Sequence, residues 1–219
     1  MPTTMSRGAI WDLDGVIIDS AAQHWESWRA LAAETNTTFT EADFRATFGL
    51  RNADIIPRFW HVHSAEQIKA LADRKEQIYR DLLRSEAHAL PGALELMQAL
   101  HEAGWKQALG SSAPVENIRL IIELLRLEPY LNAAVSGEDA PQGKPAPDIF
   151  LAAARALELA PVNCVVIEDA VAGVQAAHAA GMRCVAVTNG LPNPNLAIAD
   201  RVVLTLEDVT VAQMTELVE

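Results

Sequence analysis

Residues 10 to 20 read Ile10-Trp11-Asp12-Leu13-Asp14-Gly15-Val16-Ile17-Ile18-Asp19-Ser20. A short apolar run, Gly8 to Trp11, stops abruptly here at an Asp-x-Asp-Gly sequence. The pattern predicts a buried strand that ends in two carboxylates, Asp12 and Asp14. One carboxylate can act as a nucleophile and the second can transfer a proton, with a metal ion to hold them together. The stretch favours phosphoryl-transfer chemistry, although aspartates also occur in turns and as helix caps.

Apolar runs of strand length recur along the rest of the chain, and helix-length segments separate most of them. The runs are Gly8 to Trp11, Lys106 to Gly110, Ala133 to Ser136, Cys164 to Ile167, Cys184 to Val187 and Arg201 to Leu204. Short apolar strands with helical crossovers predict a parallel sheet that is covered on both faces. We therefore expect an α/β fold with a doubly wound, Rossmann-like parallel sheet.

Residues 20 to 90 interrupt this alternation because they show helical patterns only. Ser20 and Gln23 fit a capping box before a helix over 21–34, and further helical segments are expected at 41–48 and 65–85. Pro91-Gly92 marks the return to the alternating pattern. We expect a core domain of residues 1–19 and 91–219, with an all-helical domain of residues 20–90 inserted after the first strand.

Composition narrows the class of partner. The chain has 219 residues, of which 50% are hydrophobic and 21% charged, so we expect an ordered globular protein. Its formal charge of −12 argues against nucleic acid or an anionic membrane as the main partner, since both favour a basic surface. An acidic protein that handles phosphate must offset the repulsion locally, with lysine, arginine or a divalent cation.

The sequence shows neither a signal-peptide pattern nor a membrane-spanning run, which bears on where the protein is found. Residues Met1 to Arg7 lack the apolar stretch of a signal peptide, and no run reaches the ~20 apolar residues of a membrane span. We expect a cytoplasmic protein that acts as a monomer. Cys164 and Cys184 each open an apolar run, where a thiol packs as a small hydrophobe, so we expect no disulfide.

Polar side chains follow several of the predicted strands. In open parallel sheets, ligands bind beyond the carboxyl ends of the strands. Ser111-Ser112 follows one run, Glu168-Asp169 follows another, and Lys144 lies between them in a proline-rich loop, Gly143 to Asp148. Each has a structural reading as well: a helix cap, a solvated surface charge or a helix start. Capping alone does not account for all of them at sheet-end positions in this order.

The full order of these residues resembles the motif set of the haloacid dehalogenase superfamily of phosphatases and phosphomutases. The resemblance covers nearly the whole chain and places that superfamily's cap domain at the inserted helices. It implies that Asp12 is the nucleophile that takes up the phosphoryl group and that Asp14 is the general acid and then base. Ser111 and Lys144 would hold the phosphoryl oxygens.

The same resemblance implies a Mg²⁺ site formed by Asp12, the backbone carbonyl of Asp14, Glu168 and Asp169. A set of hard oxygen ligands suits Mg²⁺ better than zinc, and neither cysteine stands with a histidine at zinc-site spacing. Together with Lys144, the ion would neutralise the transferring group inside an acidic protein.

The cap domain is similar to that of the β-phosphoglucomutases, from Asp19 to Ala32. By that resemblance His24, Arg51 and Lys75 are candidate substrate-binding residues, with Arg51 on a substrate phosphate. Ser112, in the loop after a core strand, is a further candidate substrate-binding residue. The loop after Ser111 departs from the mutases, because Ser112 is followed by Ala113-Pro114 where those enzymes carry a serine and a lysine for a second phosphate. In this loop the chain is more similar to the sugar-phosphate phosphatases of the same subgroup.

We therefore expect a Mg²⁺-dependent phosphoric monoester hydrolase that acts on small phosphorylated metabolites of the sugar-phosphate class through an aspartyl-phosphate. A β-phosphoglucomutase is the alternative. A response-regulator receiver also has an aspartate, a hydroxyl residue and a lysine at sheet ends, but it needs neither Asp14 nor a helical cap. A dehalogenase proper would use Asp12 on carbon without a metal, which leaves Glu168-Asp169 without a role.

Overall fold

The computed structural model describes residues 6–47, 50–191 and 193–219. Their backbone forms a parallel sheet whose strands are β1 (Gly8–Trp11), β2 (Lys106–Gly110), β3 (Ala133–Val135), β4 (Cys164–Glu168), β5 (Arg183–Val187) and β6 (Arg201–Val203). Each strand lies within about a residue of an expected apolar run. The expected doubly wound parallel sheet is confirmed.

The helices separate into those before and those after residue 90. The first group contains α1 (Ala21–Glu34), α2 (Glu41–Thr47), α3 (Asn52–Trp60) and α4 (Ala65–Glu86). The second group contains α5 (Ala93–Glu102), α6 (Val115–Leu125), α7 (Asp148–Ala156), α8 (Val171–Ala179), α9 (Val211–Glu216) and the 3₁₀ turns η1 (Pro161–Asn163), η2 (Pro194–Ile198) and η3 (Leu206–Asp208). The chain divides into two compact units, Ser20–Ala87 and the described remainder, so the helical unit ends at Ala87, before the expected boundary at residue 90.

The sheet has the strand order β3-β2-β1-β4-β5-β6, with every neighbouring pair parallel. The first strand therefore lies in the middle, where Trp11 pairs with Leu109 of β2 and with Ile167 of β4. This register brings the residues that follow β1, β2 and β4 to the same end of the sheet. Strand order reverses between β1 and β4, which is where open α/β sheets bind ligands.

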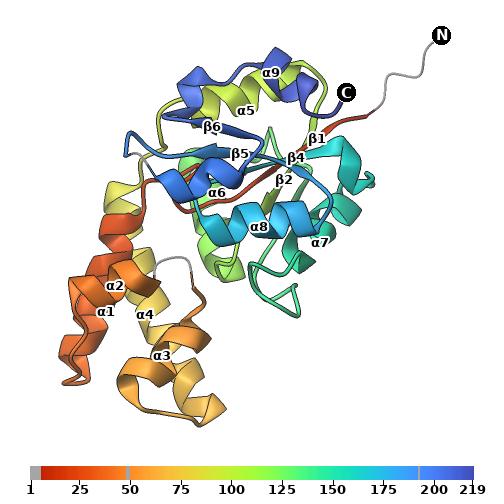
Figure 1. Cartoon of the computed structure of the whole chain (residues 1–219). Coiled ribbons are helices and arrows are strands. Elements are labelled where there is room, and N and C mark those ends of the chain that lie inside the picture. Colours follow the sequence, from red (N-terminus) through yellow and green to blue (C-terminus); the bar gives the residue numbers. More distant parts are fainter. Residues whose placement is uncertain (1–5, 48–49, 192) are drawn as a thin grey trace. The chain divides into compact units, whose positions relative to one another are not determined.

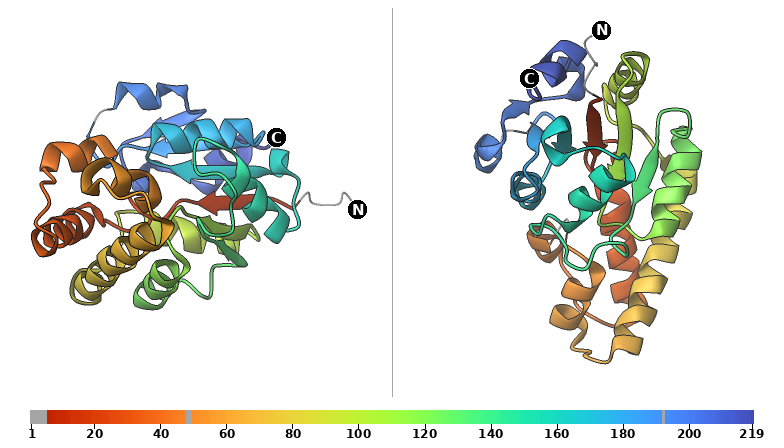
Figure 2. Two further views of the ribbon diagram at one scale, coloured as in Figure 1. Left: turned by 90° about the horizontal axis from the view of Figure 1, so that it is seen from below. Right: turned by 90° about the vertical axis from the view of Figure 1, so that its right-hand side faces the viewer.

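Alternate residues of the strands face opposite helix layers, because side chains in a strand alternate with a period of two. Ile10, Ala108 and Val166 belong to the apolar cluster that includes residues of α7 and α8. On the other face, Trp11 Nε1 donates to Gln107 Oε1, and Gln107 Nε2 donates to the Met97 carbonyl of α5. Figures 1 and 2 show helices on both faces of the sheet.

The helical unit has an apolar core of its own. Trp28 and Leu31 of α1, Phe44 of α2, and Ile55 and Ile56 of α3 are buried together. Within this unit the most extensive packing is between α1 and α4, which lie side by side in both figures. The unit is therefore held together by packing between helices rather than by the sheet.

Two details of the helical unit correct the sequence analysis. Helix α3 was not expected, since Pro57 lies inside it and proline weakens a helical pattern; burial of Ile55 and Ile56 stabilises it nevertheless. The capping box was wrong: Ser20 is the N-cap of α1, but its side chain makes no capping hydrogen bond, and Gln23 Oε1 has no partner among the described residues.

Further expectations concern the signal peptide, the end of the second expected helix, membrane spans and the two cysteines. Residues 1–5, on which the signal-peptide argument partly rests, and Phe48, the expected end of the second helix, lie outside the described residues. Within the described ranges, every helix is too short or too polar to cross a membrane. Cys164 and Cys184 are both buried free thiols, as expected.

Candidate active site

The centre of the site is an ion-paired lysine between two carboxylates. Lys144 Nζ lies 2.8 Å from Asp12 Oδ1 and 2.6 Å from Glu168 Oε1. Asp12 directly follows β1, and Glu168 ends the adjacent strand β4. The sheet register thus explains why these two acids meet, and the loop before α7 brings the lysine to them.

Lys144 is not a solvated surface charge, which was its structural reading. Only 8% of its side chain is exposed, and its ammonium also lies 4.9 Å from the ring centroid of Phe150 in α7. Burial alone would lower the pKa of Lys144, but the carboxylates of Asp12 and Glu168 raise it above its usual range. The lysine is therefore a fixed positive charge in this site.

Three carboxylates lie close enough to share one ion. Asp12, Glu168 and Asp169 each offer an oxygen atom, and these atoms all lie within 4.8 Å of one another. The Asp14 carboxylate is not in this group, and the expected contribution of Asp14 was its backbone carbonyl. An all-oxygen set of this kind is what Mg²⁺ or Ca²⁺ prefers.

The pKa values of two of these acids are raised, which indicates an excess of negative charge in the site. Burial is the largest cause that raises the pKa of Asp12 to about 7; Lys144 opposes it, while Glu168 and Asp14 add to it. Burial, followed by the charges of Glu168 and Asp12, raises the pKa of Asp169 well above its ordinary value. One lysine does not balance the cluster, so the residues present fit a divalent cation.

Glu168 is held rigidly by the start of the next helix. Its Oε2 accepts hydrogen bonds from the backbone N–H groups of Asp169 and Ala170, both at 2.8 Å. A Cβ atom at Gly173 in α8 would occupy the position of the Glu168 carboxylate. The helix-start reading of Glu168 is thus correct locally, and the same carboxylate also faces Lys144 and the other acids.

Asp14 lies on the loop that follows β1, and a glycine shapes this loop. Gly15 has a φ of +77°, and a Cβ atom there would overlap the Asp169 carboxylate. The Gly15 N–H donates to the Ile18 carbonyl at 2.9 Å. The Asp14 charge contributes to the raised pKa values of Asp12 and Asp169, so Asp14 is electrostatically part of the cluster.

The loop after β2 contains the expected hydroxyl residues. Ser111 is buried, and its Oγ accepts a hydrogen bond of 3.1 Å from the Ala113 N–H, while its own N–H donates to the Val135 carbonyl. Neither Ser111 nor Ser112 caps α6, whose N-cap is Pro114. The Ser111 hydroxyl keeps its proton available for donation to a ligand.

Two expected substrate-binding residues form a pair within the helical unit. Lys75 Nζ lies 2.8 Å from His24 Nδ1 and 2.9 Å from Glu76 Oε1, and Lys75 is 1% exposed. Because an ammonium group only donates, Nδ1 of His24 is the acceptor. The His24 ring stacks on Tyr79 with centroids 4.0 Å apart. The charge of Lys75 is therefore already compensated by Glu76.

Arg51 is more open than Lys75. It is the N-cap residue of α3, 37% of its side chain is exposed, and its Nε lies 3.5 Å from Asp54 Oδ2. A half-exposed pair of this length is weak, so the guanidinium can exchange partners. The next residue, Asn52, donates to Glu76 at 2.7 Å, which ties the start of α3 to α4.

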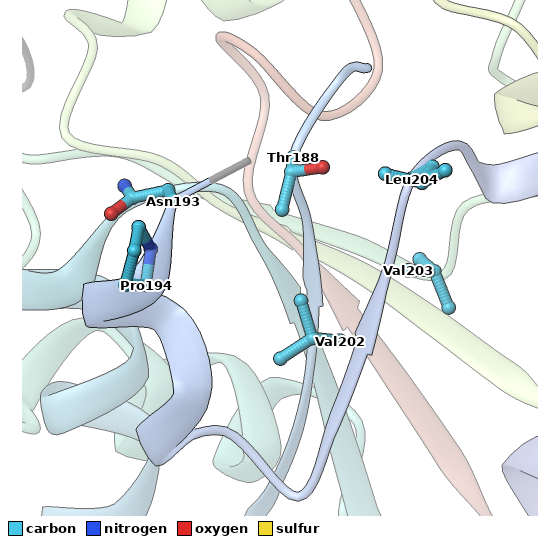
Figure 3. A pocket seen from close by; sticks show the side chains of 6 residues that line it. All are labelled: Thr188, Asn193, Pro194, Val202, Val203 and Leu204. Carbon is cyan, nitrogen blue, oxygen red and sulfur yellow. The ribbon is translucent and has the colours of Figure 1, made fainter. Parts of the chain in front are cut away.

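A cavity of about 280 Å³ lies beside β5 and β6, and none of its lining residues is one of the predicted site residues. Figure 3 shows its lining, which is mostly apolar: Thr188, Asn193, Pro194, Val202, Val203 and Leu204. From the sequence, Val202, Val203 and Leu204 were expected only as part of a strand, and no lining residue was expected to bind a ligand. Also overlooked was Asn189, which follows β5 at the same end of the sheet and donates to the Gly15 carbonyl at 2.7 Å. The rule that led to Ser111 and Glu168 would have found it.

Comparison with known proteins identifies the family. The family model for haloacid dehalogenase-like hydrolases matches residues 7–181. The chain belongs to this family. It is thus an enzyme of the hydrolase or phosphotransferase class, and the expected resemblance is confirmed.

The relatives include both of the enzyme types considered above. The chain is 35% identical to hexitol phosphatase A of Escherichia coli over 221 residues, with 94% of each protein covered. It is 32% identical to a β-phosphoglucomutase of Bacillus subtilis over 218 residues, covering 96% of this chain and 94% of that protein. A crystal structure of β-phosphoglucomutase from Clostridium difficile superposes with a TM-score of 0.88 at 27% identity, covering 98% of this chain and 97% of the other.

Proposed function

We propose that the chain is a Mg²⁺-dependent phosphatase of small sugar phosphates that acts through an aspartyl-phosphate on Asp12. The observation that carries the proposal is the buried triad of Asp12, Lys144 and Glu168, with Asp169 beside it. A carboxylate nucleophile, a fixed cation and a group of hard oxygen ligands are the parts that phosphoryl transfer to an aspartate requires.

In the first step, an Asp12 oxygen attacks the phosphorus atom and the bond to the sugar oxygen breaks. Asp14, in its protonated form, donates its proton to that leaving oxygen. In the second step, the Asp14 carboxylate takes a proton from water as the water oxygen attacks the same phosphorus. The Asp12–phosphorus bond breaks, and inorganic phosphate leaves.

Lys144 and Ser111 stabilise the phosphoryl oxygens in both steps. Lys144 offers three donors and is held by two carboxylates, so the transferred group meets a positive charge that needs no reorganisation. The Ser111 hydroxyl donates to a second oxygen. Asp12, Glu168, Asp169 and the Asp14 carbonyl would hold Mg²⁺, which supplies charge neutralisation for the phosphoryl group.

The loop after Ser111 favours hydrolysis over mutase turnover. A mutase must retain a bisphosphate intermediate, so it needs a second phosphate contact from the core. Here Ala113 and Pro114 offer no polar side chain, and Pro114 has no N–H. The Ala113 N–H already donates to Ser111 Oγ, and its carbonyl accepts from Gly137. The intermediate would therefore escape, or water would reach the aspartyl-phosphate first.

The relatives support sugar phosphates as the substrate class, since one is named a hexitol phosphatase and the other a β-phosphoglucomutase. We assign recognition of the sugar end of the substrate to the helical unit. In this assignment the Arg51 guanidinium donates hydrogen bonds to a phosphate or hydroxyl oxygen of the substrate. His24 and Lys75 would act as one unit, because Lys75 is buried between His24 and Glu76.

The test is a panel of sugar phosphates given to the purified protein with Mg²⁺ and scored for inorganic phosphate. Hexitol 6-phosphates, fructose 1-phosphate and β-glucose 1-phosphate are included, and the Asp12→Asn variant is the blank. Phosphate release above that blank supports the proposal. Absence of release from every substrate overturns it.

The second candidate is a β-phosphoglucomutase, which the 32% identity over 96% of the chain supports. The same panel separates the two functions if glucose 6-phosphate is measured alongside inorganic phosphate. Glucose 6-phosphate formed from β-glucose 1-phosphate with little free phosphate would establish the mutase.

A further inference from the structure

We propose that Asn189 is a positioning residue for Asp14. The proposal rests on the proposed function, in which Asp14 transfers protons in both steps. Asn189 Nδ2 donates a 2.7 Å hydrogen bond to the carbonyl of Gly15, the residue that follows Asp14. This hydrogen bond joins the loop after β5 to the loop after β1. The two strands are not neighbours in the sheet, because β4 lies between them.

Both polar backbone groups of Gly15 are engaged by this arrangement. Its N–H donates to the Ile18 carbonyl at 2.9 Å, and its carbonyl accepts from Asn189. Gly15 also has a φ of +77°, a conformation that glycine adopts easily. Because glycine has no side chain, its backbone is restrained less than that of other residues. The two hydrogen bonds therefore fix the backbone next to Asp14, and with it the direction in which the Asp14 side chain leaves the chain.

The donor side is itself anchored to the sheet. The Thr188 N–H donates to the Val203 carbonyl, and the Gly190 N–H donates to the Leu204 carbonyl, both at 3.0 Å. Asn189 stands between them with a φ of 51°. Asparagine is among the few residues that adopt this left-handed conformation readily and also carry an N–H donor. One side chain thus satisfies the backbone requirement of the turn and reaches the catalytic loop.

The direct test is Asn189→Gly, which removes the donor and still permits the left-handed backbone. We expect kcat for sugar-phosphate hydrolysis to fall by about three- to tenfold, the usual range for one hydrogen bond, with KM within about twofold of wild type. Asn189→Asp keeps the shape and tolerates the same φ, but a carboxylate cannot donate. It should lose at least as much kcat.

The matched control is Asn36→Gly. Asn36 has the same φ of 51° but lies in the helical unit, after α1. This variant should leave kcat within about twofold of wild type. A purely structural role for Asn189 would make the two variants alike in kcat, and that result would overturn the proposal. Wild-type kcat in Asn189→Asp would overturn it as well.

Combination with Asp14→Ala separates this inference from the proposed function. If Asn189 acts through Asp14, then Asn189→Gly should cause less than a twofold further loss in the Asp14→Ala background, measured in single turnovers. Full activity of Asp14→Ala would refute the proposed role of Asp14. An inactive Asp14→Ala together with a fully active Asn189→Gly would refute only the present inference.

Discussion

The Lys144 ammonium lies 2.8 Å from Asp12 Oδ1. The candidate nucleophile is therefore held in place by the same cation that would bind the phosphoryl group. Because Lys144 also contacts Glu168, it keeps a partner when Asp12 turns toward phosphorus. The pair accounts for a preorganised site.

Replacement of Asp12 by asparagine should abolish turnover and leave the fold intact. The change is nearly isosteric, but it removes the nucleophile and one metal ligand, so kcat should fall by at least ~10⁴-fold. Phosphate release and the far-ultraviolet circular dichroism spectrum are the measurements. A purified variant that keeps a tenth of wild-type activity would rule out Asp12 as the nucleophile.

Divalent cations should control both activity and stability. EDTA should abolish phosphate release by the enzyme, and added Mg²⁺ should restore this activity. Ca²⁺ should compete without supporting turnover, because it prefers more ligands at longer distances. Phosphate release after each addition is the measurement. Full activity in EDTA would instead favour a dehalogenase-like reaction on Asp12.

The stabilisation by Mg²⁺ should increase with pH. The pKa of Asp12 is raised from 3.8 to about 7, so this group stabilises the metal-free fold below about pH 4, and that contribution is lost as pH rises through 7. Mg²⁺ replaces the lost proton, and also any proton held by Asp169, whose pKa is raised as well, so its apparent Kd should fall by at least about tenfold per pH unit between pH 5 and 7. Calorimetric titration measures it. A Kd independent of pH, or an equally steep dependence in Asp12→Asn, would contradict the assignment.

Changes at Asp14 should separate catalysis from binding. Asp14→Asn should leave KM largely unchanged and lower kcat, since the amide cannot exchange the proton, and Asp14→Ala should slow both steps. Steady-state kinetics on the best sugar phosphate provide the measurement. Equal losses of binding and turnover in both variants would indicate that Asp14 is structural.

Gly173→Ala should destabilise the protein, against the usual trend for a helix. Alanine normally stabilises a helix relative to glycine, but here its Cβ would take the place of the Glu168 carboxylate. We expect a loss of about 1–3 kcal/mol in the free energy of unfolding and weaker Mg²⁺ binding. Denaturant titration measures the first. A variant more stable than wild type would show that Glu168 can move freely.

Replacement of Ala113-Pro114 by Ser-Lys should shift the balance toward isomerisation. The new lysine would supply the second phosphate contact that the core lacks, so the bisphosphate would be retained longer. The ratio of glucose 6-phosphate to inorganic phosphate formed from β-glucose 1-phosphate should rise at least about threefold. An unchanged ratio would mean that this loop does not decide between the two reactions.

The strands could be predicted from sequence because each is a short apolar run with a polar residue after it. Two of those polar residues, Ser111 and Glu168, together with Lys144 of the proline-rich loop, identified the core of the candidate site. Helix α3 was missed because Pro57 weakens its local signal, and only tertiary packing of Ile55 and Ile56 reveals it. Asn189 itself satisfies the sheet-end rule, but its hydrogen bond to Gly15 joins distant parts of the chain, and no spacing rule predicts such a contact.

The chain leaves the sheet and returns to it at nearly the same point. The Asp19 N–H donates to the His88 carbonyl at 3.1 Å, and Leu90 likewise donates to Ile17. The inserted helices are thus a closed excursion whose ends are already joined, so their length adds little to the cost of bringing β1 and β2 together. Such an excursion can be shortened, exchanged or replaced during evolution without any change in strand register. Relatives could thereby acquire new substrates while the phosphate chemistry at Asp12 stayed the same.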